Sequence, residues 1–234
     1  MNSTEPIVFV LNSDPATRGG LCELIGSRYS HVVPCGSGGE YLRRPKPDAP
    51  GCVIADIDLP DMSGLDLLRK IAATDAPVVF VTARSEVSCS VRAIKLGALD
   101  FMTIPFETTH LFEAIGEALV HDCNTRAQRA AEQSLCQRYA SLTNRERQVL
   151  RLVVIGLRNK QSASELGISG FTLQIHRGQV MQKMQARSIA DLVRMAEILK
   201  VPYYSSRALT QGHRVLPEAR DPDLWQPSPP VFDL

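Results

Sequence analysis

The side chains best suited to recognising another molecule lie in residues 159–185. The amides of Gln174 and Gln179 can bond the edges of bases in the major groove of DNA, and an apolar side chain such as Ile175 can contact a thymine methyl group. Amide, hydroxyl and cationic groups nearby can bind phosphate oxygens. The phosphate candidates are Thr172, Arg177, Lys183, Asn159 and Lys160. These residue types together point to double-stranded DNA as the partner.

One helix would position most of these groups. Ser169 is a good N-cap, and Gly167 allows a tight turn before it. The helix is expected to cover roughly residues 170–185. Its inward-facing residues would be Leu173, Val180 and Met184, whereas Phe171, Gln174, Ile175, Gly178, Gln179 and Gln182 would point away. A half-buried helix of this kind fits the major groove.

The surrounding segment, residues 141–200, predicts four short helices. Its apolar residues recur at helical spacing, and the pattern breaks at Gly156, Gly167 and Ser169-Gly170. Thr143 followed by Glu146 forms a capping box at its start. Residues 121–200 hold 13 Lys and Arg against 6 Asp and Glu, whereas residues 1–120 hold 10 against 15. This asymmetry predicts two domains with different partners, the second partner being anionic.

The first 120 residues alternate apolar runs with helical stretches. The runs are residues 7–11, 52–55, 77–81 and 99–102, with a weaker one at 32–33, and amphipathic stretches such as 18–28 and 65–73 lie between them. This order predicts an α/β doubly wound parallel five-stranded sheet. Ligands bind at the carboxyl ends of such strands. The residues found there are Asn12, Ser13, Asp56, Thr82 and Ile104.

The rest of the chain sets the domain organisation. Helical spacing from Glu107 to Tyr139 predicts a terminal helix that runs into a linker helix. The expected domains are residues 1–120, a linker at 121–140, a helical domain at 141–200 and an irregular, Pro-rich tail at 201–234. No apolar run approaches the ~18 residues that span a bilayer, and the N-terminus does not begin a secretory signal. Six cysteines without a CxxC pair indicate reduced thiols in the cytoplasm, with no metal or cofactor.

At the strand ends the chain resembles a known family. GCVIADIDLPDMSGLDLL and PVVFVTARSEVSCSVRAIKLGALDFMTIPF are similar to the third to fifth strands of bacterial receiver domains. With the second domain, the likeness is to FixJ/NarL-type response regulators over roughly residues 6–200. It implies that Asp56 holds the phosphoacceptor position, Thr82 the hydroxyl position, Phe101 the aromatic switch position, and Pro105 the proline after the fifth strand.

Three positions depart from the receiver pattern. Asn12 and Ser13 stand where receivers carry the acidic pair that helps to hold Mg²⁺, and Ile104 replaces their Lys. Phosphoryl transfer relies on charge neutralisation by the metal and a cation. The phosphoacceptor site, made of Asp56, Thr82, Phe101, Asn12, Ser13 and Ile104, is therefore expected to be vestigial. Two alternatives stay open: a one-residue slip that brings Ser13-Asp14 to the site, and phosphorylation of Asp56 in cells.

The second domain resembles the LuxR-type helix-turn-helix. LTNRERQVLRLVVIGLRNKQSASELGISGFTLQIHRGQVMQKMQARSIADLVRMAEIL matches that pattern over nearly its whole length. Ser162 departs from it, because the family places an apolar core residue there, and Gly178 weakens the helix. His176 is interpreted as a semi-buried packing residue, with a ligand role as the alternative. A helical bundle that has lost DNA binding is the alternative for the domain.

These observations predict a sequence-specific, DNA-binding transcriptional regulator of two-component type that is not an enzyme and does not depend on phosphorylation. The family implies a homodimer on a pseudo-palindromic site. The apolar stripe of Leu111, Ile115 and Leu119 is expected to extend the pairing. A histidine kinase or another response regulator is a further candidate partner, and a membrane is not. The rivals are an interaction protein that titrates a kinase or a competent regulator, and a phosphatase-like or self-phosphorylating enzyme.

Overall fold

The computed structural model describes residues 5–71, 76–83 and 87–201. The chain divides into two compact units, Met1–Gln128 and Arg129–Leu234. The segment expected to be an irregular tail lies outside the described residues, apart from Val201. Each unit is described by itself below.

The first unit is built on a five-stranded sheet in which every strand pair is parallel. Its strands are β1 (Ile7–Leu11), β2 (His31–Cys35), β3 (Gly51–Ala55), β4 (Val78–Thr82) and β5 (Asp100–Thr103), in the order β2-β1-β3-β4-β5. The predicted doubly wound sheet is confirmed. The carboxyl ends of β1, β3, β4 and β5 therefore lie along one edge.

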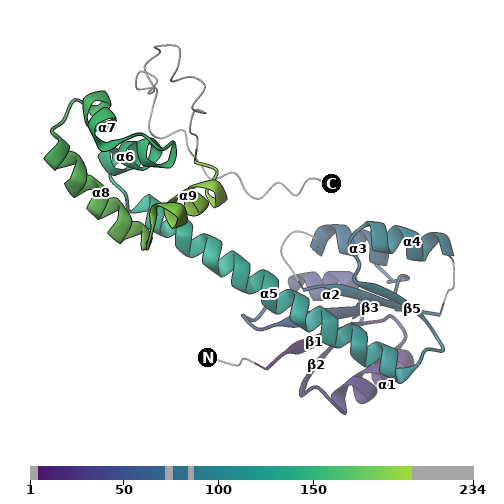
Figure 1. Ribbon diagram of the computed structural model, residues 1–234. Helices are drawn as coiled ribbons and strands as arrows, with labels where there is room; N and C mark the ends of the chain where they lie inside the picture. The colour runs from purple at the N-terminus through teal and green to yellow at the C-terminus, as the bar shows by residue number, and fades with distance from the viewer. Residues whose placement is uncertain (1–4, 72–75, 84–86, 202–234) are drawn as a thin grey trace. The chain divides into compact units, whose positions relative to one another are not determined.

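Helices cover both faces of this sheet, and side-chain alternation along the strands decides which face each one contacts. Phe9, Leu11 and Phe80 pack with α2 (Gly38–Arg43), α3 (Gly64–Ile71) and α4 (Val87–Lys95). Val8, Val10 and Ile54 point to the other face, where α1 (Pro15–Gly26) and α5 (Thr108–Ala140) lie (Figure 1). Alternating strand residues thus form two apolar layers, one on each side of the sheet.

The start of helix α1 differs from its predicted position because of local capping. The first helix starts at Pro15, three residues before the expected stretch, because Asp14 accepts a hydrogen bond from the Thr17 backbone N–H at 2.8 Å and so caps it. Proline at the first helical position is compatible with this geometry. The end of the predicted stretch 65–73 lies outside the described residues, which show α3 to Ile71.

A single 33-residue helix, α5, covers both the terminal and the linker segment. Its apolar stripe does not face a partner chain: Leu111 and Ile115 are fully buried against the sheet, and Leu119 packs against the same cluster. The expectation that this stripe extends pairing is wrong, because the stripe packs in the core of the first unit. Further along α5, Asp122 accepts hydrogen bonds from Gly51 N–H (2.9 Å) and from Arg126 (2.6 Å).

The second unit, as far as it is described (to Val201), contains four short helices after α5, as predicted. They are α6 (Asn144–Val154), α7 (Asn159–Leu166), α8 (Gly170–Met184) and α9 (Ile189–Ile198). Their core includes Leu150, Leu152 and Leu173, each fully buried. The predicted capping box is present at the start of α6, between Thr143 and Glu146. Among the described residues of both units, no helix combines the length and the apolar character needed to cross a membrane.

Candidate DNA-binding surface and phosphoacceptor site

Helix α8 has one buried and one exposed face, divided as its sequence predicts. Leu173, Val180 and Met184 are buried in the core of the second unit. The six residues predicted to point outward, Phe171, Gln174, Ile175, Gly178, Gln179 and Gln182, are all exposed. The base-contact candidates Gln174, Ile175 and Gln179 therefore share an accessible surface of one helix.

The turn before α8 sets the angle at which this helix leaves α7. Gly167 ends α7 in the left-handed conformation, with φ 63°, which glycine adopts without a steric penalty. Ser169 then caps α8 by accepting a hydrogen bond from the Thr172 N–H at 3.0 Å. The two hydroxyl oxygens of Ser169 and Thr172 lie 2.8 Å apart. These contacts produce a helix-turn-helix from purely local signals.

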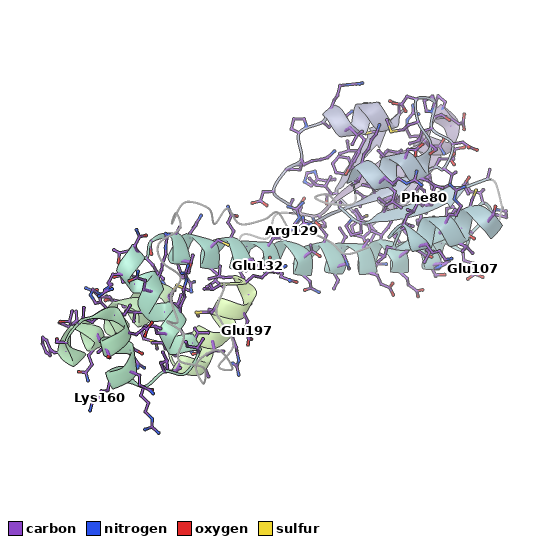
Figure 2. All side chains as sticks on the ribbon, turned by 90° about the horizontal axis from the view of Figure 1, so that it is seen from above. Phe80, Glu107, Arg129, Glu132, Lys160 and Glu197 are labelled. Carbon is purple, nitrogen blue, oxygen red and sulfur yellow. The ribbon has the colours of Figure 1, made fainter. Side chains whose placement is uncertain are left out.

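The phosphate candidates on α7 and α8 lie in different environments. Arg177 donates a hydrogen bond to the side-chain oxygen of Asn159 and so links the middle of α8 to the start of α7. Lys160 is exposed beside Asn159, and Figure 2 shows it on the outside of its unit. Thr172 is half-buried at the start of α8. The Asn159–Arg177 hydrogen bond thus joins the two helices, and Lys160 adds an exposed cation next to Asn159 in the sequence. These three residues are called the basic cluster below.

Lys183 differs from the other phosphate candidates because its ammonium group forms an ion pair with a carboxylate of the protein. Its Nζ lies 2.7 Å from Oε2 of Glu146, whose side chain is only 3 % exposed. Burial alone raises the pKa of Glu146, but hydrogen bonds from Lys183 and Thr143 outweigh burial and bring that pKa below its ordinary value. The pair joins α8 to the capping box of α6. This ion pair holds α8 in position against α6. A phosphate contact by Lys183 stays a prediction.

Several other cations of this unit bind backbone carbonyl groups. Arg145 donates to Leu166 O at 2.6 Å, Arg147 to Ala140 O at 3.1 Å, and Arg138 to Met184 O at 3.4 Å. The positive charge of residues 121–200 is therefore partly structural. Arg158 directly precedes Asn159-Lys160 and is exposed, so it is a further candidate for a phosphate contact. The sequence analysis did not name it, although its position in this basic run could have indicated it.

His176 and Ser162 are the two polar residues that the sequence marked as unusual. His176 is half-buried, in agreement with a packing residue, and its Nδ1 has no hydrogen-bond partner among the described residues. Ser162 is 1 % exposed, and its hydroxyl likewise has no partner in the described part of the chain. Ser162 thus occupies an apolar core position, as expected from its place in the pattern.

We expect Glu146→Gln to destabilise the second unit by about 1–2 kcal/mol. Glutamine keeps the capping box but loses the charged hydrogen bond, and the 36 % exposure of the Lys183 side chain limits that loss through solvent screening. Hydrogen exchange of α6 and α8 amides measures the change, with the exposed Glu197→Gln as control. Because the pKa of Glu146 is lowered on folding, its contribution is full above about pH 4.5 and is lost as the pH falls through the folded-state pKa. An equal difference between the variants at all pH values would contradict this.

The predicted phosphoacceptor site contains a neutral amide next to Asp56. The buried Asn12 donates from Nδ2 to Asp56 Oδ2 at 3.1 Å, and its Oδ1 accepts from Asp14 N–H at 2.8 Å. These two bonds define the orientation of the amide, because one end must donate and the other must accept. Asp14 instead caps α1, with its side chain on Thr17. The hydrogen bond from the Thr17 hydroxyl lowers the pKa of Asp14.

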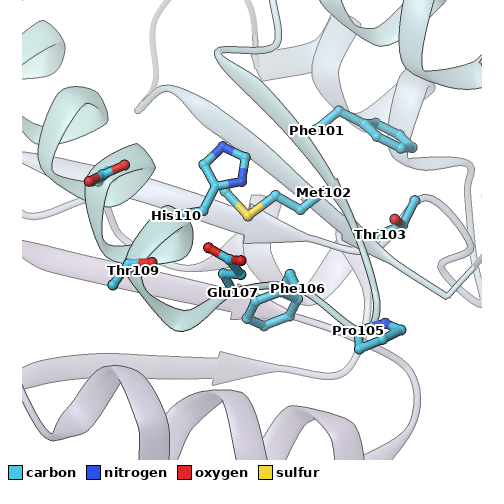
Figure 3. A pocket seen from close by; sticks show the side chains of 9 residues that line it. Phe101, Met102, Thr103, Pro105, Phe106, Glu107, Thr109 and His110 are labelled. Atoms are coloured by element: carbon cyan, nitrogen blue, oxygen red, sulfur yellow. The ribbon is translucent and has the colours of Figure 1, made fainter.

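Thr82, Ile104 and Ser13 lie at the same edge of the sheet, whereas Phe101 lies within β5. Thr82, 1 % exposed, ends β4, and its carbonyl accepts a hydrogen bond from Ile104 N–H at 2.8 Å. The Ile104 side chain is apolar and 38 % exposed. Phe101 is half-buried, with its ring centroid 6.4 Å from that of Phe80. Figure 3 shows Phe101, Thr103 and Pro105 around a pocket at the junction of β5 and α5. Ser13 is exposed beside Asn12.

The donor set around Asp56 does not fit the Mg²⁺ ion that receiver domains use. This cation requires oxygen ligands, preferably carboxylates, whereas Asn12 directs an N–H donor at the Asp56 carboxylate. Among the described residues, no group of three or more His, Cys, Asp or Glu side chains could hold a metal ion. We therefore derive no step through Mg²⁺ at this site.

Each of the two units matches a known protein family. The model "Response regulator receiver domain" matches residues 8–116, and "Bacterial regulatory proteins, luxR family" matches residues 140–196. Nodulation protein W of Bradyrhizobium diazoefficiens is 40 % identical, over 85 % of this chain and 88 % of its own length. The transcriptional regulatory protein FixJ of Azorhizobium caulinodans is 38 % identical, over 81 % and 90 %.

A solved structure extends the similarity to the fold. The response regulator StyR is 39 % identical and matches with a TM-score of 0.74, over 83 % of this chain and 99 % of its own. Response regulators that carry a LuxR-type domain are transcription factors. This chain belongs to the two-component response regulators with an N-terminal receiver domain and a C-terminal LuxR-type DNA-binding domain, and it is a regulator of transcription.

Proposed function

We propose that this response regulator binds specific DNA sites and controls transcription without phosphorylation of its receiver, and that it has no enzymatic activity. In this proposal residues 1–120 form the receiver, 121–140 the linker and 141–200 the DNA-binding domain. Gln174, Ile175 and Gln179 contact base edges. Thr172, Arg177, Lys183, Asn159 and Lys160 contact phosphates.

The observation that carries the proposal is the Asn12–Asp56 hydrogen bond. A neutral amide stabilises the unmodified carboxylate at the place where a phosphorylatable site needs a metal-binding carboxylate. The cation that would neutralise phosphoryl oxygens is also absent from position 104, where isoleucine stands. Both changes disfavour the charged, phosphorylated state, and the DNA-contact candidates of α8 lie in the other unit of the chain.

A second candidate function is an interaction protein that titrates a histidine kinase or a competent regulator. The receiver fold favours such a partner. The exposed amides and the basic cluster of α7 and α8 favour DNA binding, since an interaction protein would not require them. Electrophoretic mobility shifts on genomic fragments distinguish the two functions, because only the first predicts a discrete set of retarded fragments.

We expect Asp56→Asn to leave DNA affinity and reporter transcription within about two-fold of wild type. Amide and carboxylate have nearly the same shape, and the proposed function uses no phosphoryl group at this position. Fluorescence anisotropy on a bound fragment and a reporter assay measure the effect. Incubation with acetyl phosphate and Mg²⁺ should leave wild type unlabelled. Loss of transcription in a variant with normal thermal stability would contradict the proposal, as would a stable phosphoprotein.

We also expect the unmodified protein to bind DNA as a homodimer. Pseudo-palindromic sites present two equivalent half-sites, and a dimer contacts both. Sedimentation at micromolar concentration, with and without a bound duplex, measures the stoichiometry. A protein that remains a monomer even on DNA would contradict this expectation, whereas the Asp56→Asn variant should pair as wild type does.

A further inference from the structure

The line of α8 opposite its buried face is unusually apolar. Phe171, Ile175, Gly178 and Gln182 follow one another along this line at spacings of four, three and four residues. The Phe171 side chain is 74 % exposed and that of Ile175 is 46 % exposed. The solvent-facing line of a surface helix is normally polar. Among the described residues, no core contact accounts for an exposed aromatic side chain there, which suggests an external partner.

For Gly178 on the same line, no contact within the described part of the chain requires a glycine. A β-carbon at this position would meet no atom within 4 Å, and the backbone is not in the left-handed region. Glycine is nevertheless one of the least favourable residues inside a helix. A glycine that the described residues do not require is explained by a partner whose surface comes close to the helix backbone.

We propose that Phe171 and Ile175 read thymine methyl groups in the major groove, and that Gly178 allows α8 to lie close to the base edges. The proposal rests on the proposed DNA binding by α8. Apolar side chains, phenylalanine among them, contact the thymine C5-methyl group. The N-terminal residues of a recognition helix are those that reach the bases, and Phe171 is the second residue of α8.

The charge around this apolar line favours DNA over a second copy of the chain as its partner. The Lys160 and Arg158 side chains are exposed on α7, which packs against α8, and Arg177 lies on α8 itself. Two copies that met through this surface would bring like charges together, whereas the phosphates of a duplex complement them. Gln174 and Gln179 flank the apolar line and supply the hydrogen bonds that apolar groups lack.

The test uses the full chain and a duplex selected by it from a random library. Each thymine of that duplex is replaced in turn by deoxyuridine, which removes the methyl group and keeps base pairing. Wild type should lose affinity about four-fold at each thymine that Phe171 or Ile175 contacts, the loss expected for one buried methyl group. Phe171→Ala should abolish the loss at one subset of these positions, and Ile175→Ala at another.

Matched variants distinguish the loss of methyl recognition from a general loss of protein stability. Leu42→Ala removes an apolar side chain of 36 % exposure from α2 and should keep every methyl-sensitive position. Gly178→Ala should raise thermal stability, because alanine favours the helix, and should weaken binding several-fold. Unchanged affinity in Gly178→Ala would overturn the close approach of the backbone.

The other outcomes distinguish this inference from the proposed function. If no sequence is selected from the library, DNA recognition itself fails. If a sequence is selected but no thymine is methyl-sensitive, or if Phe171→Ala and Ile175→Ala keep all sensitivities, only methyl readout is overturned. A changed sedimentation coefficient in Phe171→Ala, with an unchanged methyl profile, would assign this surface to protein pairing and also overturn it.

Discussion

The triple variant Asn12→Asp, Ser13→Asp, Ile104→Lys should become phosphorylated by acetyl phosphate at least about 100-fold faster than wild type. It restores the two carboxylates that hold a divalent cation and the ammonium group that neutralises phosphoryl oxygens. In enzymes, loss of a single well-placed electrostatic group changes the reaction rate by about 10²–10³-fold. Restoring three such groups should therefore change the phosphorylation rate by at least that factor. Phosphoprotein formation in the presence of Mg²⁺ measures the rate.

The same variant should acquire a thermal stability that depends on Mg²⁺. Without metal, the new carboxylates repel Asp56 and replace the Asn12–Asp56 hydrogen bond of 3.1 Å. With metal, binding to the folded state raises the unfolding midpoint by mass action. The wild-type midpoint should not change with Mg²⁺. Addition of Asp56→Asn to the triple variant should abolish labelling and serves as the control. Equal labelling of wild type and triple variant would show that the three substitutions do not disable the site.

DNA affinity should fall about 10³-fold between 50 and 200 mM salt. Arg158 and Lys160 are exposed at the start of α7, and Arg177 is half-buried on α8. With three phosphate contacts each, two protomers would together neutralise about six phosphates. Each neutralised phosphate contributes a slope of about −0.9 in a plot of log affinity against log salt. Fluorescence anisotropy at several salt concentrations measures this slope. A flat dependence would show that these cations are not the DNA-contacting groups.

Two substitutions on α8 should separate phosphate contacts from base contacts. Arg177→Ala should reduce the salt slope by about 1 for each protomer and weaken specific and nonspecific DNA about equally. Gln174→Ala should instead relax base preference at one position, by about 1–3 kcal/mol for a good bidentate contact. Lys70→Ala, which removes an exposed cation of α3 in the receiver, is the matched control and should leave the slope unchanged.

Local signals were enough to predict these elements, and the resemblance of longer sequence stretches predicted the family. The apolar run of residues 7–11 is the strand β1, and Thr143 with Glu146 forms the predicted capping box. On α8, helical periodicity identified Leu173 as buried and Gln174 as exposed. These features depend on neighbouring residues or on a short repeat, and the sequence contains both.

Contacts between distant residues were not predictable from the same patterns. The apolar stripe that begins at Leu111 has a helical spacing that suits a dimer interface as well as it suits a core face. Only its packing against the sheet shows that it belongs to the core. Asn12 and Asp56 are separated by 44 positions, and Lys183 and Glu146 by 37. Periodicity reports that a side chain faces inward or outward, but not which charge or amide it meets.

The amino-acid sequence by itself therefore predicted a parallel α/β receiver followed by a helix-turn-helix. It also predicted which residues of the candidate recognition helix face the core and which face solvent. Tertiary structure decided which groups remain accessible on that helix and which are already paired. Lys183 is the clearest case, because from sequence it is a cation on a DNA-binding helix. In the folded unit its ammonium lies 2.7 Å from the buried Glu146 carboxylate. A buried carboxylate is stable only when a partner compensates its lost hydration, and the fold alone brings that partner within reach.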